Sequence, residues 1–234
     1  MRFSFVIPAY NEEKYLGGCV ESVKAQTFKD YEIIISYSQS KDRTLQIAKA
    51  NGSKVVQVPK SFPGKARNAA AKFARGDYLV FLDADVQVPE NFLANTNKIL
   101  KTGAMAVGYE FVPMENDREI GRDMKMIFNP FNRYTKNLSC CYTVKKTAFD
   151  SIGGYDERRE VSEDTDISAR LARVGKINFT RSVMPKMSVR RFHEMGRIRA
   201  MGMYFMWFLL GFVLGAKVKY FHVSDIKQKI NRAA

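Results

Sequence analysis

Residues 76–85 read Gly-Asp-Tyr-Leu-Val-Phe-Leu-Asp-Ala-Asp, and this stretch decides the fold. Its apolar centre, residues 78–82, is typical of a buried strand. The strand ends in Asp83 and Asp85, two carboxylates whose burial without a partner is costly. Because open α/β folds bind ligands at the carboxyl edge of a parallel sheet, we expect both acids at such an edge. A divalent cation carrying a nucleotide diphosphate would satisfy them.

Strand and helix patterns alternate on both sides of this stretch. Apolar runs predict strands over residues 3–7, 31–35, 54–58, 78–82 and 104–111. The intervening segments 13–26, 43–50, 64–74 and 89–100 are predicted helices. The alternation predicts an α/β fold with a doubly wound, mostly parallel sheet flanked by helices. Farther on, the pattern is less regular and predicts helices over 117–136 and 163–174 and a strand over 138–144.

The C-terminal part of the chain has a different character. Residues 200–216 carry no charged side chain and are bracketed by Arg197, Arg199, Lys217 and Lys219. Their length is near the lower limit for a bilayer span, about 17–25 residues. We expect a C-terminal apolar helix that contacts a membrane, either spanning it or lying in its interface. An oligomer contact and a buried core helix are the alternatives.

The charge composition of the chain indicates which binding partners it favours. The net charge of +14 and the pI near 9.7 favour anionic partners: nucleic acid, phosphorylated substrates or an acidic membrane face. A solvated basic surface is the simpler interpretation. No helix-turn-helix, zinc or RNA-binding motif is present, so nucleic acid is not an expected partner. Three cysteines without metal-ligand spacing indicate reduced thiols and a cytosolic catalytic face. The apolar run 3–7 is too short for a signal peptide.

Five motifs occur together in a recognisable order. Residues 7–13 (Ile-Pro-Ala-Tyr-Asn-Glu-Glu) follow the first strand, and residues 64–70 (Gly-Lys-Ala-Arg-Asn-Ala-Ala) open the helix before Asp83-Ala84-Asp85. Residues 152–157 (Ile-Gly-Gly-Tyr-Asp-Glu) precede residues 162–166 (Ser-Glu-Asp-Thr-Asp). Over about residues 1–195 the chain thus resembles the family 2 glycosyltransferases, inverting enzymes of the GT-A fold that use nucleotide-diphospho sugars.

The resemblance implies a domain organisation. It implies a catalytic domain over residues 1–195, with a nucleotide-binding half (1–103) and an acceptor half (104–195). Residues 196–234 would then form the membrane-associated helix and a basic tail. The motif of processive polymerising relatives, with paired Gln and Arg-Trp, is absent, so we expect transfer of single sugars.

A metal site is implied by the same motifs. Asp83 and Asp85 are hard oxygen donors suited to Mg²⁺ or Mn²⁺, and in the resemblance Asp85 ligates the ion while Asp83 contacts the ribose or shares the ion. Gln87 completes Asp-Ala-Asp-Val-Gln, similar to dolichyl-phosphate mannose synthases, where the equivalent Gln helps hold the metal. His193 is a further candidate ligand. Alternatively, the acids cap the helix that starts near Pro89.

A base is implied as well, because an acceptor hydroxyl must lose its proton as it attacks the sugar. Asp164 matches the family's catalytic base, and Glu163 is the second candidate. The alternative is that these acids complement a helix dipole, worth about 0.3–1 kcal/mol. If the acceptor is a lipid phosphate, it is already ionised and Asp164 would position it or help to bind metal.

The remaining expected site residues bind the donor. The resemblance assigns the nucleotide to a set of residues at strand ends and on the helix before residue 76: Pro8, Ala9, Tyr10, Glu12, Ser38, Asp42, Arg67, Asp83 and Ala84. Arg190 or Arg191, in a segment similar to a loop that closes over the diphosphate, would bind the phosphates. Many members carry acids after the second strand where this chain has Tyr37 and Ser38, which leaves a UDP-linked or a GDP-linked donor open.

The expected activity is metal-assisted transfer of a sugar by a single displacement, from a nucleotide-diphospho sugar to a lipid-linked or membrane-proximal acceptor. The expected location is the cytoplasmic face of the cell membrane, with peripheral or single-pass attachment. Three alternatives stay open. They are a soluble enzyme acting on a glycan, protein or small molecule, a basic nucleic-acid-binding protein, and an inactive scaffold that binds nucleotide sugars.

Overall fold

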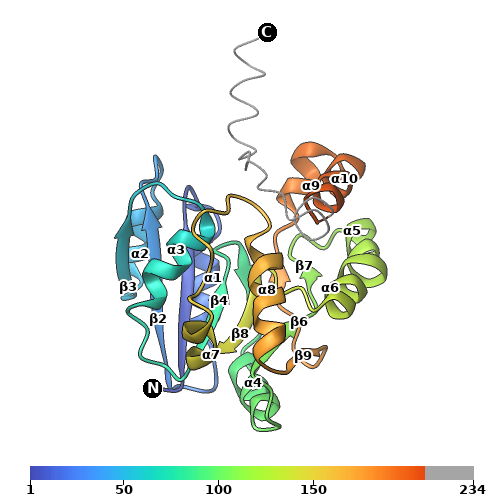
Figure 1. Cartoon of the computed structure of the whole chain (residues 1–234). Helices are drawn as coiled ribbons and strands as arrows, with labels where there is room; N and C mark the ends of the chain where they lie inside the picture. Colours follow the sequence, from blue (N-terminus) through green and yellow to red (C-terminus); the bar gives the residue numbers. More distant parts are fainter. Residues whose placement is uncertain (209–234) are drawn as a thin grey trace.

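The fold is built on one large twisted sheet, and the computed structural model describes residues 1–208 (Figure 1). The sheet has seven strands in the order β3-β2-β1-β4-β8-β6-β9. Their bounds are β1 Phe3–Ala9, β2 Tyr31–Ser38, β3 Lys54–Val58, β4 Tyr78–Leu82, β6 Ala106–Tyr109, β8 Cys141–Lys145 and β9 Ile177–Thr180. β4, the apolar strand that ends at Asp83 and Asp85, lies between β1 and β8 and is buried along its whole length.

Six of the seven strands run in the same direction. β1 pairs in parallel with β2 and β4, β2 with β3, and β6 with β9. Only β8 runs antiparallel to its neighbours β4 and β6. The predicted α/β fold with a mostly parallel sheet is therefore confirmed. The parallel arrangement brings the carboxyl ends of β1, β2 and β4 to one edge.

Helices cover both faces of the sheet and create two cores. One core joins α1 (Leu16–Lys24) and α4 (Phe92–Leu100) to side chains such as Phe5 of β1. The other joins α3 (Pro63–Ala71), α7 (Lys146–Ser151) and α8 (Glu163–Val174) to the opposite side chains, such as Val6. Because side chains alternate along a strand, β1 contributes to both cores. α2 (Thr44–Ala50) follows β2.

A smaller layer lies beside the large sheet. Three short strands, β5 (Val86–Gln87), β10 (Lys186–Met187) and β7 (Val112–Pro113), form a second sheet in that order. The helix predicted over 117–136 is three consecutive pieces: α5 (Arg118–Asp123), the π-helix η1 (Met124–Phe128) and α6 (Asn129–Thr135). Lys136 ends it in the left-handed conformation, with φ of 58°.

The expected apolar C-terminal helix is not supported as predicted. α9 (Arg190–Met195) and α10 (Arg197–Phe208) lie above α5 and α6 in Figure 1. α10 begins three residues before the predicted segment, and residues 209–216 of that segment lie outside the described residues. No helix within residues 1–208 has the length and the apolar character that a bilayer span requires.

A substitution at Gly76 tests how closely the loop that precedes β4 packs against β1. A Cβ at Gly76 would lie 2.7 Å from the backbone of Phe3 and Ser4, whereas one at Gly17 meets only a side-chain methyl of Ile47 at 4.0 Å. We expect Gly76→Ala to lower the free energy of unfolding by about 1–3 kcal/mol through overpacking. Gly17→Ala, in a helix, should leave it unchanged or raise it by up to about 1 kcal/mol. Urea denaturation measures both, and equal effects of the two variants would contradict this packing.

Candidate active site

One cavity of about 1130 Å³ lies at the carboxyl edge of the large sheet. It is lined by most of the residues that the sequence singled out: Pro8, Ala9, Tyr10, Glu12, Ser38, Arg67, Asp83, Ala84, Asp85, Glu163, Asp164, Arg190 and Arg191. These residues come from the ends of β1, β2 and β4 and from α3, α8 and α9. The fold thus gathers at one edge residues that are far apart in the sequence.

The first charged group in the cavity centres on Arg190 of α9. Its guanidinium makes a bidentate contact with Glu12, with N–O distances of 2.8 and 2.5 Å. The same guanidinium lies 3.0 Å from an oxygen of Asp85 and 4.7 Å from the ring centre of Tyr15. A bidentate arginine–carboxylate pair is strong and directional. Arg190 therefore brings α9 onto the ends of β1 and β4.

Burial makes the two carboxylates of this group reluctant to ionise. Desolvation raises the pKa of Asp85 to about 7, although Arg190 opposes the shift. Burial also raises the pKa of Glu12, again against the effect of Arg190. Arg190 and Arg191 both lower the two pKa values but do not offset the desolvation of the carboxyl groups, so an additional positive charge would be favoured here.

The second charged group centres on Arg67 of α3, which is buried with 4% of its surface exposed. Its guanidinium nitrogens lie 2.6 Å from Asp83, 3.2 Å from Glu163 and 3.5 Å from Asp164. Its carbon lies 5.3 Å from the ring centre of Tyr155. Because three carboxylates share one cation, this group also carries an excess of negative charge.

Asp164 is the least satisfied carboxylate of the second group. Its Oδ1 atom is buried and makes no hydrogen bond among the described residues. Burial and the neighbouring charge of Glu163 raise its pKa well above the ordinary value, and Arg67 only partly offsets them. A carboxylate that lines a cavity, has a raised pKa and is held only by an ion pair of 3.5 Å is suited to accept a proton.

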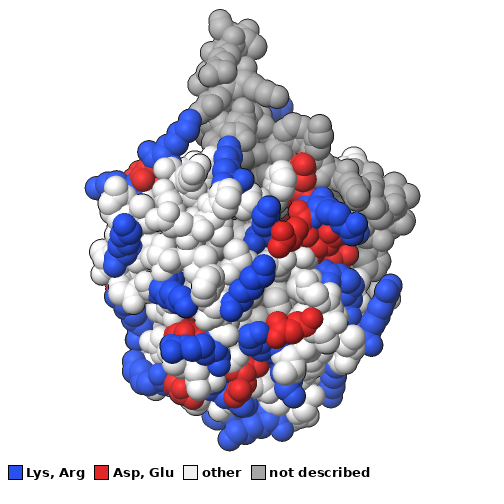
Figure 2. All heavy atoms as spheres, turned by 60° about the vertical axis from the view of Figure 1, so that its left-hand side comes forward, with Lys and Arg blue, Asp and Glu red and all other residues white. Residues whose placement is uncertain are grey.

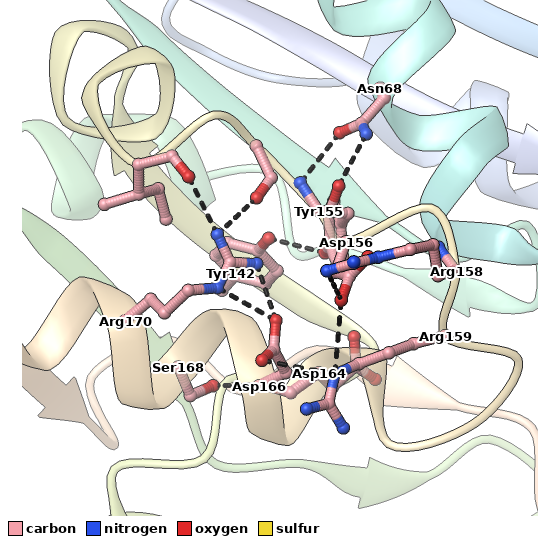
Figure 3. A network of polar contacts seen from close by, with 12 residues as sticks. Asn68, Tyr142, Tyr155, Asp156, Arg158, Arg159, Asp164, Asp166, Ser168 and Arg170 are labelled. Atoms are coloured by element: carbon pink, nitrogen blue, oxygen red, sulfur yellow. Dashed lines mark hydrogen bonds and ion pairs between the residues drawn. The ribbon is translucent and has the colours of Figure 1, made fainter. Parts of the chain in front are cut away.

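A polar network fixes the first turn of α8, which carries Asp164 (Figure 3). Asp166 receives both an ion pair from Arg159, at 3.2 Å, and hydrogen bonds from Arg170. Arg170 also donates to the carbonyls of Ile152 and Gly154. The loop 152–157 is thereby joined to α8. The motif that the sequence singled out positions the helix that carries the candidate base.

The same loop is joined to α3 on its other side. The side chain of Asn68 accepts from the Tyr155 amide and donates to the Tyr155 carbonyl, both at 2.9 Å (Figure 3). The Tyr155 hydroxyl meets that of Tyr142 on β8. Gly154 adopts a φ of 69°, and a Cβ there would lie 2.6 Å from the Asn68 oxygen. Asn68 lies one residue after Arg67, so one helix holds both the loop and the arginine.

Three predicted site residues do not line the cavity. Asp42 accepts from the amide of Glu13 at 3.1 Å and from Thr44 and thus fastens the loop after β1 to α2. The amide of Gln87 packs against Gly18, where a Cβ would lie 2.6 Å from its nitrogen. The imidazole of His193 pairs with Asp117 at 2.8 Å and is 49% exposed. The structure thus places two of the predicted metal ligands outside the lining of the cavity.

Aromatic side chains of the acceptor half and of α10 form an apolar wall that the sequence did not predict. Phe128 of η1, Phe192 of α9 and Tyr204 of α10 line the cavity, with ring centres 5.7–6.4 Å apart. Their aromatic character was visible, but no local pattern brings these three segments together. Tyr134, which lies in the same predicted helix, points away and is 89% exposed.

The mostly parallel sheet matches the GT-A fold of solved glycosyltransferases. The sequence model of glycosyl transferase family 2 matches residues 4–157, and the chain belongs to that family. An uncharacterised glycosyltransferase of Rickettsia typhi is 27% identical over 207 residues, which are 80% of this chain and 63% of that protein. TarS of Staphylococcus aureus, a poly(ribitol-phosphate) beta-N-acetylglucosaminyltransferase, is 34% identical over 93 residues, which are 36% of this chain and 16% of that protein.

Solved structures share the fold. A TarS fragment in complex with UDP-GlcNAc has a TM-score of 0.69 at 22% identity, covering 79% of this chain and 57% of that one. The mannosyltransferase PcManGT of Pyrobaculum calidifontis, in complex with GDP-Man and Mn²⁺, has a TM-score of 0.66 at 21% identity. The match covers 85% of this chain and 60% of that one. The chain spans less than two thirds of the length of the Rickettsia and TarS relatives.

Removal of the Asn68 amide tests the network behind the site. Asn68→Ala leaves the buried amide and carbonyl of Tyr155 without partners, which should cost about 1–3 kcal/mol of unfolding free energy. Asn95→Ala, which removes an amide that contacts only the preceding turn of α4, should cost less than about 1 kcal/mol. Urea denaturation compares them, and hydrogen exchange should be faster in residues 152–157 of Asn68→Ala alone. Equal losses in both variants would contradict the role of Asn68.

Proposed function

We propose that this chain transfers a sugar from a nucleotide-diphospho sugar, UDP-linked or GDP-linked, to an acceptor hydroxyl or phosphate by a single, inverting displacement. The observation that carries this proposal is the pair of under-compensated carboxylate groups around Arg190 and Arg67 in one cavity. The family supports the reaction class. The UDP-GlcNAc and GDP-Man bound in the two solved structures support the donor class.

The residues fit a divalent cation that the donor completes. Within residues 1–208 no three His, Cys, Asp or Glu side chains form a ready-made cation site. Asp83 and Asp85 nevertheless supply hard oxygen donors, and burial of Asp85 favours an added positive charge. Mg²⁺ is commonly held by one or two carboxylates together with substrate phosphates. Mn²⁺ or Mg²⁺ at these acids would offset the charge that develops on the departing diphosphate.

Arg190 and Arg191 are proposed to bind the diphosphate. In the described structure Arg190 is paired with Glu12 and Asp85. A divalent cation at this edge would compete with Arg190 for these carboxylates, and the guanidinium would then be available for a phosphate fork with the donor. Pro8, Ala9, Tyr10, Ser38 and Ala84 line the rest of the donor end and are proposed to contact the base and ribose.

Asp164 is proposed to take the proton of an acceptor hydroxyl, with Glu163 as the second candidate. Its buried Oδ1, which makes no hydrogen bond among the described residues and lies 3.5 Å from Arg67, and its raised pKa support this role. The attacking oxygen must approach the sugar from the face opposite the diphosphate. The charged group of Arg67 lies beside that of Arg190 in the cavity, so one donor can reach both groups.

The acceptor is proposed to be lipid-linked or membrane-proximal, and the catalytic domain to act at the cytoplasmic face of the membrane. The apolar wall of the cavity and the basic composition support this proposal. A soluble acceptor is the second candidate, because the polar end of the cavity would serve it equally. A nucleic-acid partner is not favoured: Figure 2 shows Lys and Arg scattered over one face with Asp and Glu among them.

The first test separates metal binding from folding. Asp85→Asn keeps the shape of the side chain and removes its charge. We expect it to weaken Mn²⁺-dependent binding of UDP or GDP by roughly a hundredfold, about 2.7 kcal/mol, in titration calorimetry. Asp77→Asn, which changes an exposed acid paired with Arg2, is the matched control and should bind normally. Unchanged Mn²⁺-dependent binding in Asp85→Asn would refute the metal role.

The second test separates binding from chemistry. Asp164→Asn should leave Mn²⁺ and nucleotide affinity within about threefold of the original, because it touches neither the metal nor the phosphates in this proposal. It should lower the rate of sugar transfer roughly 10²–10⁴-fold, the usual contribution of a general base. Single-turnover kinetics measure the rate with whichever donor binds. A transfer rate equal to that of the original chain would exclude Asp164 as an essential base.

A further inference from the structure

We propose that the apolar arm of the cavity, between η1 and α10, is an acceptor subsite that holds the hydrocarbon chain of an amphiphilic acceptor. This proposal rests on the proposed function, because it assigns the acceptor of the same reaction. It commits to one occupant, a long alkyl or isoprenoid chain, whose polar end reaches Asp164. The inference rests on a single cavity that is lined by charged side chains at one end and by apolar side chains at the other.

The arm is continuous with the reactive end. Tyr204 of α10 belongs to the aromatic wall, where its ring centre lies 6.4 Å from that of Phe128. Tyr204, Arg191 and Asp85 line the same cavity, so the aromatic wall and the charged end belong to one continuous space. The chain and the reacting group of a single amphiphile could occupy the two ends together.

The mouth of the arm is formed by exposed aliphatic and aromatic side chains. Ile127 of η1 and Ile198 and Phe205 of α10 all line the cavity, and 48%, 85% and 64% of their surfaces are exposed. Such a cluster of exposed large apolar side chains indicates an interaction site. Side chains of this kind offer no hydrogen bonds to sugar hydroxyls, so they match a hydrocarbon chain better than a soluble glycan.

The walls of the arm are fastened to each other. Arg197, at the start of α10, makes a bidentate pair with the buried Asp123 of α5, at 2.5 and 2.8 Å. His193 of α9 pairs with Asp117 at 2.8 Å. These pairs hold α9 and α10 against α5, so the space between them is part of the folded structure. A pre-formed apolar space is the usual property of a ligand site.

Gly202 leaves open space on the side of α10 that lines the cavity. It lies in the middle of α10, where glycine costs about 1 kcal/mol of helix stability relative to alanine. It lines the cavity, and a Cβ at this position would meet no heavy atom within 4 Å. A glycine in a helix interior, facing empty space, allows a ligand to approach the backbone closely.

The polar end of the arm has an open hydrogen-bond acceptor. Asn137 lines the cavity and donates from its amide to Asn132 at 3.2 Å, which leaves its buried Oδ1 without a partner among the described residues. The next residue, Leu138, is bonded to Ser168 of α8, which in turn contacts the Asp164 carbonyl. Asn137 and Asp164 therefore belong to neighbouring segments, and each has an oxygen that makes no hydrogen bond among the described residues.

The test fills the arm without disturbing the donor end. The probe is cis-parinaric acid, a fluorescent long-chain fatty acid, titrated into the full chain. Gly202→Trp should weaken its binding at least about tenfold, equivalent to about 1.4 kcal/mol, because the indole occupies the arm. Gly202→Ala is the matched control, since it changes helix propensity but adds only one methyl group, and it should bind the probe normally. Phe205→Ser should also weaken binding, whereas Phe73→Ser, at an exposed site away from the cavity, should not.

Competition identifies what the arm recognises. Decanol should displace the probe, because it presents a chain without a charge, whereas acetate and maltotriose should not. Displacement by acetate would assign binding to the arginines, and displacement by maltotriose would assign the arm to a glycan; either result overturns the proposal. Equal probe affinity in Gly202→Trp and Gly202→Ala would also overturn it. Mn²⁺-dependent nucleotide binding should be unchanged in Gly202→Trp. If the original chain bound the probe but neither UDP nor GDP with Mn²⁺, the proposed donor site would be refuted and the acceptor arm would not.

Discussion

The structure of this site depends on a charge imbalance at one edge of the sheet. Carboxylates from three segments converge there: Glu12 after β1, Asp83 and Asp85 after β4, and Glu163 and Asp164 of α8. Arg67 and Arg190 form ion pairs with them. Buried carboxylates without sufficient positive charge hold their protons more tightly, which is the cause of the raised pKa values of Asp85 and Asp164. A cation and a diphosphate are proposed to complete this balance: the metal joins the carboxylates, and the arginine joins the phosphates.

The same ion pairs connect the charged edge to the rest of the fold. Arg190 and Glu12 are 178 positions apart in the sequence, and their contact places α9 over the ends of β1 and β4. Arg67 and Asn68, adjacent on α3, hold the acids of α8 and the loop 152–157. The position of each functional side chain therefore follows from a few long-range contacts made by neighbouring residues, and the acceptor arm is formed by the helices that these contacts bring together.

Sequence predicted the parts of this arrangement that local patterns determine. The run over residues 76–85 indicated a buried strand ending in acids, and β4 has these bounds and this burial. The strand predicted over 138–144 corresponds to β8, but its antiparallel direction has no local signature, because it depends on the distant partners β4 and β6. The same holds for the two-residue strands of the small sheet. Gln87 was assigned by similarity of sequence, but β5 directs its amide to Gly18. The apolar arm could not be predicted, because η1 and α10 meet only through tertiary contacts.

A divalent cation shared by Asp85 and the donor diphosphate is the central element of the proposed mechanism. Anomalous diffraction from crystals grown with Mn²⁺ and UDP, and in parallel with GDP, tests it most directly. We expect an anomalous peak within coordination distance of Asp85, about 2.0–2.2 Å for a carboxylate oxygen and a small divalent ion, with Arg190 released from Glu12 onto the diphosphate. A nucleotide bound without a peak at Asp85, or a peak elsewhere with the Arg190–Asp85 contact intact, would contradict this mechanism.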